Sequence, residues 1–140
     1  MDSVYTIELA SFDSPYPPWY LYFLRELAGD LFLVARDKKR RVIGYIIAAP
    51  FLEVACHILS IAVAPECRRR GVGGALLESV LELCSLQGRR AVTLEVEATN
   101  TAAQSFYRLH GFLPLRFIPD YYGPGRHALQ MIRLLTPLEE

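Results

Sequence analysis

Three consecutive arginines and three nearby glycines stand between a β-branched segment and an apolar helical segment. The stretch reads CRRRGVGGALLESVLEL over residues 67–83, and it follows HILSIAV at residues 57–63. The β-branched segment predicts a strand that Pro65 ends, and the apolar residues after the glycines recur at helical spacing. The chain must therefore form a strand, a short basic loop and a helix N-terminus in close succession.

The loop has the composition of a phosphate site. A helix N-terminus carries unpaired backbone N–H groups and partial positive charge, so it attracts phosphate where a ligand approaches the main chain. Glycines permit that approach because they lack a Cβ, and arginines add charge-assisted donors. The residues concerned are Arg68, Arg69, Arg70, Gly71, Gly73 and Gly74. A diphosphate is the ligand that such a loop favours.

Three phosphate-binding patterns compete for this loop. A P-loop requires G-K-[ST], which the chain does not contain here. A dinucleotide fingerprint would need glycine where Leu76 stands, although Glu95 lies at the distance of its ribose-binding acid. That alternative stays open, but Pro65 and the arginines separate the glycines from the strand. The third pattern is Arg68-x-x-Gly71-x-Gly73 after a strand and before a helix.

Length and composition indicate one domain that spans residues 1–140. Half the residues are hydrophobic (52%), and 15 acidic residues balance 15 basic ones, so a nucleic-acid partner is not expected. Cys56, Cys67 and Cys84 are odd in number and form no C-x-x-C pair, which predicts neither disulfides nor a metal site. No export signal or membrane span is visible. We expect a cytoplasmic protein without a membrane partner.

Hydrophobic periodicity predicts an α/β domain with a mixed sheet. Residues 4–9 (VYTIEL) fit either a strand or a helix capped by Asp2 or Ser3, whereas residues 15–19 (PYPPW) predict a rigid loop before a helix at 20–27. Thr99 is the expected N-cap of a helix that packs through Ala102, Ala103, Phe106 and Leu109. The other predicted elements are strands at 31–36, 42–49 and 57–63, a helix at 72–88, and strands at 91–97, 113–118 and 127–135.

Three segments in order resemble the GNAT superfamily of acetyl-CoA-dependent N-acetyltransferases. They are LSIAVAPECRRRGVGGALLE, LEVEATNTAAQSFYRLHGF and DYYGPGRHALQM. Their order and spacing are similar to those of the RimI-type N-terminal protein acetyltransferases and their archaeal NatA-like relatives, over roughly residues 5–135. The resemblance implies the GNAT fold, a mixed and mostly antiparallel sheet flanked by helices. The family's usual first strand is missing, because residues 2–12 look like its first helix.

The resemblance also implies how acetyl-CoA, the cosubstrate, is held. The backbone at Ile61, Ala62 and Val63 is expected to bond the pantetheine arm and to polarise the thioester carbonyl. Asn100 is expected to contact the cofactor. The loop expected to hold the pyrophosphate comprises Arg68, Arg69, Arg70, Gly71, Val72, Gly73 and Gly74.

Catalytic roles follow from the same resemblance. Tyr107 lies seven residues after Asn100, on the same side of one helix, and is the expected acid for the departing CoA thiolate. Glu95 holds the position of the RimI-type base, and His57 is a second candidate from the NatA-like pattern H-x-x-S-[IL]-A-V. Alternation places His57, Leu59, Ile61 and Val63 on one strand face. Both candidates for the base stay open.

Tyr16, Tyr121 and Tyr122 are expected to bind the substrate peptide. The predicted reaction is direct attack of a protein N-terminal amine on the thioester, with ribosomal protein alanine or a broader NatA-like range of N-termini as substrate. The alternatives are acetylation of a small amine or a lysine side chain, and a non-catalytic acyl-CoA-binding protein. The family's YYxxGEDA reads YYGPGRHA here, and its loop glutamate falls near Ser14, where Asp13 is the closest acid.

Overall fold

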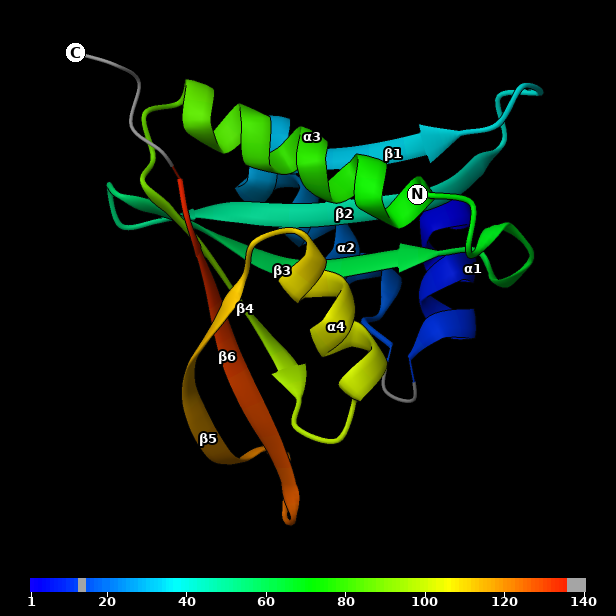
Figure 1. Ribbon diagram of the computed structural model, residues 1–140. Coiled ribbons are helices and arrows are strands. Elements are labelled where there is room, and N and C mark those ends of the chain that lie inside the picture. Colours follow the sequence, from blue (N-terminus) through cyan, green and yellow to red (C-terminus); the bar gives the residue numbers. More distant parts are fainter. Residues whose placement is uncertain (13–14, 136–140) are drawn as a thin grey trace.

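Six strands form one mixed sheet in the computed structural model, which describes residues 1–12 and 15–135 (Figure 1). The strand order is β1-β2-β3-β4-β6-β5, and every neighbouring pair is antiparallel except β3 and β4. The predicted mixed, mostly antiparallel sheet is thus confirmed. The strands are β1 (Phe32–Arg36), β2 (Val42–Phe51), β3 (Ala55–Val63), β4 (Ala91–Glu97), β5 (Leu113–Gly123) and β6 (Arg126–Leu134).

Helices cover both faces of the sheet. Figure 1 shows α1 (Asp2–Ser11) and α2 (Pro18–Ala28) behind it, and α3 (Val72–Leu86) and α4 (Thr101–Leu109) in front. Residues 2–11 are therefore a helix, and no strand precedes it in the described residues, as expected. The rigid loop predicted at 15–19 is two residues too long, because α2 already begins at Pro18. Proline is well suited to the first helical turn. Two short 3₁₀ turns complete the fold, Gly29–Leu31 and Pro65–Cys67.

The helix that follows the basic loop is anchored by an apolar stripe. Its buried residues are Leu76, Leu77, Val80, Leu81 and Cys84. Gly71 stands at the N-cap with φ of 82°, a left-handed conformation that glycine adopts without steric cost. The sharp entry into α3 therefore depends on that glycine.

The parallel ladder between β3 and β4 is short. It comprises only Ala55↔Ala91, Cys56↔Val92 and His57↔Thr93. Beyond these pairs the strands diverge, and α4 lies between their separating ends (Figure 1). The β4-facing edge of β3 is thus left without a strand partner over its second half, and this opening holds the candidate site.

A β-bulge alters which residues share a face of β3. The register to β2 moves from Ile47↔Ser60 to Ala48↔Ile58, so Leu59 has no partner. Because paired residues in an antiparallel ladder point to the same side, His57 shares its face with Ser60 and not with Ile61. The prediction that strict alternation continues from His57 to Val63 is therefore wrong. The bulge turns His57 toward the α1–α2 side and Val63 toward α3.

The start and the packing face of α4 also differ from the prediction. The N-cap is Asn100 and not Thr99, because the Asn100 side chain accepts a hydrogen bond from the Ala103 N–H at 3.0 Å. Leu109 is 85% exposed, and Tyr107 is the residue that α4 buries. A tyrosine ring therefore replaces the expected leucine as the anchor of the helix. β5 extends to Gly123, five residues beyond the strand predicted at 113–118.

The buried stripe of α3 yields a stability prediction. Leu77→Ala should lower the free energy of unfolding by about 3 kcal/mol, since it removes a fully buried side chain and leaves a cavity. Leu86→Ala on the same helix is the matched control, because Leu86 is 71% exposed. Urea denaturation compares the two variants. Equal losses in both would contradict the assignment of the buried face.

Candidate active site

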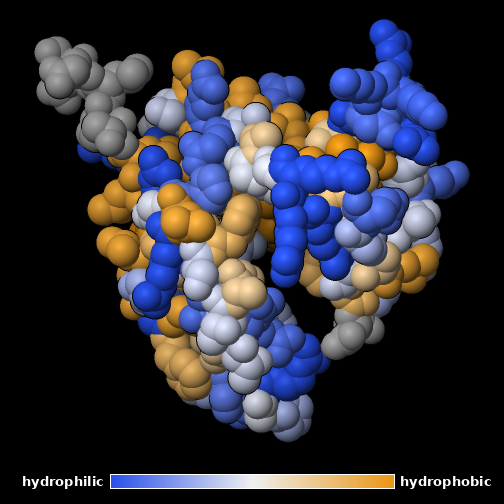
Figure 2. Space-filling model, turned by 45° about the vertical axis from the view of Figure 1, so that its right-hand side comes forward, coloured by the Kyte–Doolittle hydropathy of each residue, from blue (hydrophilic) through white to orange (hydrophobic). Residues whose placement is uncertain are grey.

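A pocket of about 600 Å³ lies where β3 and β4 separate. One wall comes from α1 and the residues that follow it, another from α4, and a third from the β5–β6 hairpin. Figure 2 shows the opening between the lower lobe and the right-hand part of the molecule, with hydrophilic residues at its rim. The lining includes Glu8, Ser11, Tyr16, Ser60, Ile61, Glu95, Glu97, Asn100, Tyr107, Tyr122 and Arg126. A separate hollow between β1 and α3 contains none of the predicted site residues.

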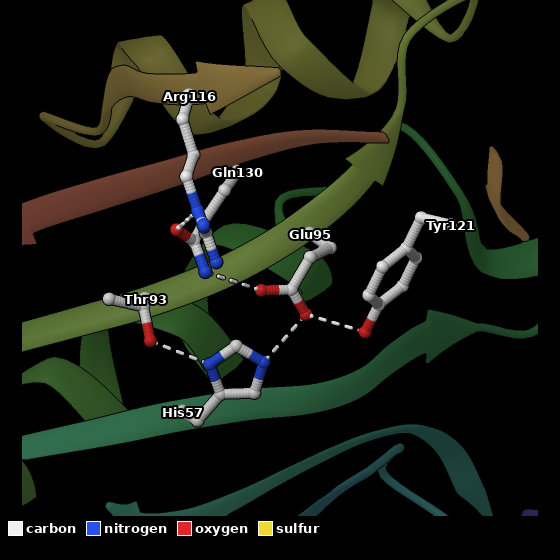
Figure 3. A network of polar contacts seen from close by, with 6 residues as sticks. All are labelled: His57, Thr93, Glu95, Arg116, Tyr121 and Gln130. Atoms are coloured by element: carbon white, nitrogen blue, oxygen red, sulfur yellow. Dashed lines mark hydrogen bonds and ion pairs between the residues drawn. The ribbon is translucent and has the colours of Figure 1, made fainter. Parts of the chain in front are cut away.

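His57 and Glu95 contact each other across the diverging strands (Figure 3). His57 Nε2 lies 2.8 Å from Glu95 Oε1, and His57 Nδ1 lies 2.6 Å from the hydroxyl of Thr93. An ionised carboxylate accepts hydrogen bonds but donates none, so the Nε2 proton points to Glu95. In the neutral ring Nδ1 then accepts from Thr93. Both ring nitrogens of His57 are thereby engaged.

Glu95 receives three side-chain donors. Besides His57, the Tyr121 hydroxyl donates to Oε1 at 3.0 Å, and the Gln130 amide donates to Oε2 at 2.9 Å. Arg116 holds that amide in place through Gln130 Oε1 at 3.0 Å (Figure 3). Burial acts to raise the pKa of Glu95, but the hydrogen bonds from His57, Gln130 and Tyr121 outweigh it and lower the pKa. The carboxylate is therefore ionised at neutral pH.

Tyr107 points a buried phenol into the same pocket. Its ring packs against Phe106 and Phe112, with centroids 5.3 and 5.8 Å away. The described residues provide no hydrogen bond to its hydroxyl, and burial raises the pKa of Tyr107 to about 12. The phenol is consequently protonated at neutral pH and has a proton to donate. Asn100 lines the same pocket, as their seven-residue spacing predicted.

The basic loop presents main-chain donors at the start of α3. No side chain caps this helix, and its first turn contains no acidic residue. Arg69 and Gly71 both adopt positive φ, at 65° and 82°, and Arg69 and Arg70 are exposed. These features fit a diphosphate, which would satisfy the free N–H groups and the arginines together.

Arg68 and the two inner glycines have further structural contacts. Arg68 donates to the Val63 carbonyl and to the Ser11 hydroxyl, both at 3.0 Å, so it ties the end of β3 to α1. Gly74 lies beneath the His110 ring, where an added Cβ would stand 3.3 Å away. At Gly73 an added Cβ would meet Phe106 at 3.6 Å. The contact at Gly74 is the tighter of the two, so this glycine allows His110, at the end of α4, to approach α3 closely.

Aromatic rings surround the outer end of the pocket. Tyr121 and Tyr122 stack edge to face at 4.9 Å, and burial together with Glu95 raises the pKa of Tyr121 to about 12. Arg126 pairs with Glu97, and its guanidinium stands 5.8 Å from the centre of the Tyr122 ring. The arginine that departs from the family pattern is therefore part of this rim. Asp13 and Ser14 lie outside the described residues.

Sequence reasoning missed Glu8, which also lines the pocket. Its side chain is buried in α1 and accepts from the Tyr45 hydroxyl and from the backbone N–H of Tyr16, the latter at 2.9 Å. The Tyr45 hydroxyl also lies 3.0 Å from Ser60. Nothing in the local pattern marks Glu8, since a glutamate in a short helix is ordinarily exposed. Only the assembled fold brings it to the site.

Two further structural findings concern metals and membranes. Among residues 1–12 and 15–135, no group of three or more His, Cys, Asp or Glu side chains is arranged to hold a metal ion. The helices in this part of the chain are all too short or too polar to cross a bilayer.

The lowered pKa of Glu95 predicts a pH-dependent contribution to stability. Because the folded-state pKa lies below the ordinary value of 4.5, the unfolded chain binds the proton first as the pH falls. The stability that Glu95 contributes is present above that value and declines below it. The stability difference between the wild type and Glu95→Gln should therefore shrink from about pH 7 to about pH 3, as measured by urea denaturation. A constant difference would contradict this account.

Comparison with known proteins identifies the family to which this chain belongs. Residues 1–112 match the acetyltransferase (GNAT) family. The N-alpha-acetyltransferase of Sulfolobus acidocaldarius is 31% identical over 145 residues, which cover 94% of this chain and 84% of that protein. A Bacillus subtilis protein with the provisional name ribosomal protein bS18-alanine N-acetyltransferase is 35% identical over 133 residues, covering 94% of this chain and 87% of that protein.

A solved structure agrees with this result. Ard1 from Thermoplasma volcanium superposes with a TM-score of 0.92 at 32% identity, covering 96% of this chain and 90% of that chain. The fold and family expected from the three sequence segments are confirmed. The chain belongs to the GNAT family and is an acetyl-CoA-dependent N-acetyltransferase of the N-alpha-acetyltransferase type.

Proposed function

We propose that the pocket between β3 and β4 acetylates the N-terminal amine of proteins, with Glu95 as the base and Tyr107 as the acid. One observation carries the proposal. An ionised carboxylate and a protonated phenol, the two groups that amide formation from a thioester requires, line one pocket from β4 and α4. Residues 1–140 act in this proposal as a single acetyltransferase domain.

Glu95 accepts the proton that the substrate amine must lose. An N-terminal ammonium has a pKa near 8, so most protein N-termini are protonated at neutral pH. Each must lose a proton before its nitrogen can attack the thioester. His57 is the positioning residue of this pair, because its Nε2–H donates to Glu95 while Nδ1 is held by Thr93. A histidine with both nitrogens engaged is a poor proton acceptor unless its contacts break. The two candidates for the base thus take different roles.

Tyr107 supplies the proton at the other end of the reaction. When the amine nitrogen bonds to the acetyl carbon and the carbon–sulfur bond breaks, the departing thiolate gains a proton from the phenol. The raised pKa of about 12 keeps that proton on Tyr107 until it is needed. Ring packing against Phe106 and Phe112 holds the hydroxyl in place.

Acetyl-CoA supplies the activated acetyl group, and the chain provides main-chain groups to hold it. The edge of β3 at Ile61, Ala62 and Val63 has no partner on β4, so its backbone is free to bond the pantetheine arm. Backbone N–H groups there stabilise the oxyanion that forms during attack. The start of α3, from Arg69 to Gly74, holds the pyrophosphate. Asn100 completes the cofactor wall beside Tyr107.

Tyr16, Tyr121 and Tyr122 receive the first residues of the peptide. Tyr16 and Tyr122 line the pocket, as do Glu97 and Arg126, which form an ion pair, and Tyr121 packs against Tyr122. Relatives named as N-alpha-acetyltransferases and as a ribosomal-protein alanine acetyltransferase support protein N-termini, ribosomal proteins among them, as substrates. The three cysteines are buried and unpaired, which supports a reducing compartment such as the cytoplasm.

Acetyl transfer from labelled acetyl-CoA to short peptides tests the substrate class. Peptides that begin with Ala, Ser, Met-Leu or Met-Glu are each compared with an N-blocked twin that contains lysine. Transfer to free N-termini alone is the expected result, and its rates rank the first residues. Transfer to the lysine twins or to small amines would overturn the proposal in favour of those substrates. Binding of CoA without any transfer would indicate a non-catalytic acyl-CoA-binding protein.

Tyr107→Phe tests the acid. The variant keeps the buried ring but has no proton to donate, so kcat should fall roughly 100-fold while the KM for acetyl-CoA stays the same. Steady-state kinetics with the preferred peptide measure both values. Tyr5→Phe in α1 is a control outside the pocket lining and should leave kcat unchanged. An unchanged kcat in Tyr107→Phe would exclude the acid role.

The pH dependence of kcat/KM separates the roles of Glu95 and His57. Glu95→Gln should abolish the acidic limb of the profile, because the group that titrates is gone. His57→Ala should retain that limb and move it to higher pH, since a donor that lowers the pKa of Glu95 is lost. Loss of the limb in His57→Ala alone would instead make His57 the base.

A further inference from the structure

Glu8 is a buried carboxylate whose contacts join four parts of the fold. The residue is only 2% exposed and projects from α1. Its Oε1 accepts from the Tyr45 hydroxyl of β2 and lies 3.4 Å from the Ser60 hydroxyl of β3. Its Oε2 accepts from the backbone N–H of Tyr16 at 2.9 Å. The three donors, two hydroxyls and one backbone N–H, are neutral, so they hold the carboxylate by hydrogen bonds without an ion pair.

Only one of these contacts, the bond to Tyr16, involves a residue that is proposed to bind the peptide. Tyr45 and Ser60 lie in the central strands, which the sheet ladder already holds in register. Tyr16 lies in the connection between α1 and α2, outside any helix or strand. A segment without a ladder of its own depends on side-chain contacts for its position. The Glu8–Tyr16 bond is such a contact, and it fastens the connection to the sheet.

Tyr16 belongs to the pocket that holds Glu95 and Tyr107, the groups assigned to catalysis. Tyr16, Glu8 and Glu95 line one pocket. Burial raises the pKa of Tyr16, and the charges of Glu8 and Glu95 raise it further, which places its hydroxyl within their electrostatic reach. The ring packs against Tyr20 of α2 at 5.0 Å, and Tyr20 contacts Trp19 at 5.6 Å. Any displacement of Tyr16 therefore changes both the pocket and this aromatic cluster.

We propose that Glu8 is a positioning residue for the peptide substrate, which acts by fixing Tyr16 through its backbone N–H. Tyr16 then presents its ring as one wall for the first residues of the peptide. The inference rests on the proposed N-terminal acetylation and adds a residue to its substrate side. In this proposal the carboxylate acts through Tyr16 and not through a contact of its own with the peptide.

Glu8→Ala and Glu8→Gln separate positioning from charge. Alanine removes the acceptor for the Tyr16 N–H, so the peptide KM should rise roughly tenfold, while the acetyl-CoA KM is unchanged and kcat changes less. Glutamine retains an amide oxygen that can face Tyr16, and the Tyr45 and Ser60 hydroxyls can accept from its NH₂ group. Glu8→Gln should therefore restore most of the peptide affinity. Equal KM effects in the two variants would overturn positioning through this bond.

Tyr45→Phe is the matched structural control. It deprives the same carboxylate of a buried donor and should lower stability, but it leaves the Tyr16 bond in place. Its peptide KM should stay near the wild-type value. A double-mutant cycle with Tyr16→Ala completes the test, because Glu8→Ala should add nothing to the peptide KM once the Tyr16 ring is absent. Additive effects, or a raised peptide KM in Tyr45→Phe, would contradict the proposal.

Trp19 provides a readout that does not depend on activity. It is the single tryptophan of the chain, and it belongs to the aromatic cluster that Tyr16 joins. Glu8→Ala should lower the fluorescence anisotropy of Trp19, whereas Glu8→Gln and Tyr45→Phe should not. If no peptide is acetylated by the wild type, the proposed function fails while this measurement still decides whether Glu8 holds the segment. Unchanged anisotropy in folded Glu8→Ala would overturn the inference.

Discussion

The early end of the β3–β4 ladder is the constraint on which the rest of the structure depends. Two parallel strands joined by only three residue pairs must separate, and they do so beyond His57 and Thr93. Buried backbone groups without partners are costly, so the free edge of β3 requires either solvent or a ligand. The fold lines the opening with α4, α1 and the β5–β6 hairpin. Because β3 and β4 separate, the sheet leaves room for an extended ligand between them.

Polar groups occupy this opening in two hydrogen-bonded clusters. Nearer the surface, Glu95 is held by His57, Tyr121 and Gln130. Deeper in the core, Glu8 is held by Tyr45 and by the backbone of Tyr16. Each carboxylate is costly to bury, and each is satisfied by donors from segments that only the folded chain brings together. The polar network therefore depends on sheet formation.

That several of the candidate residues lie together was predictable from the sequence, but their contacts were not. The family resemblance singled out Asn100 and Tyr107, their spacing of two helical turns predicted that they share one side of a helix, and both line the pocket. His57 and Glu95 were proposed as competing bases, and the structure joins them in one hydrogen-bonded pair. Alternation failed to predict the face of His57 because the bulge at Leu59 is set by pairing with β2. A pattern within one strand contains no information about its partner's register.

The sequence by itself determined the basic loop, the helix after it and the succession of helices and strands along the chain. Glycine, charge and hydrophobic periodicity act over a few residues, so these features are visible locally. The sequence also determined the family, since three segments keep their order along the chain. The tertiary structure alone decided that Glu8 enters the site, that Asn100 caps α4, and that Arg126 pairs with Glu97. The physical reason is distance along the chain. Glu8 and Ser60 are separated by 52 residues, and only packing of α1 on the sheet brings them into contact.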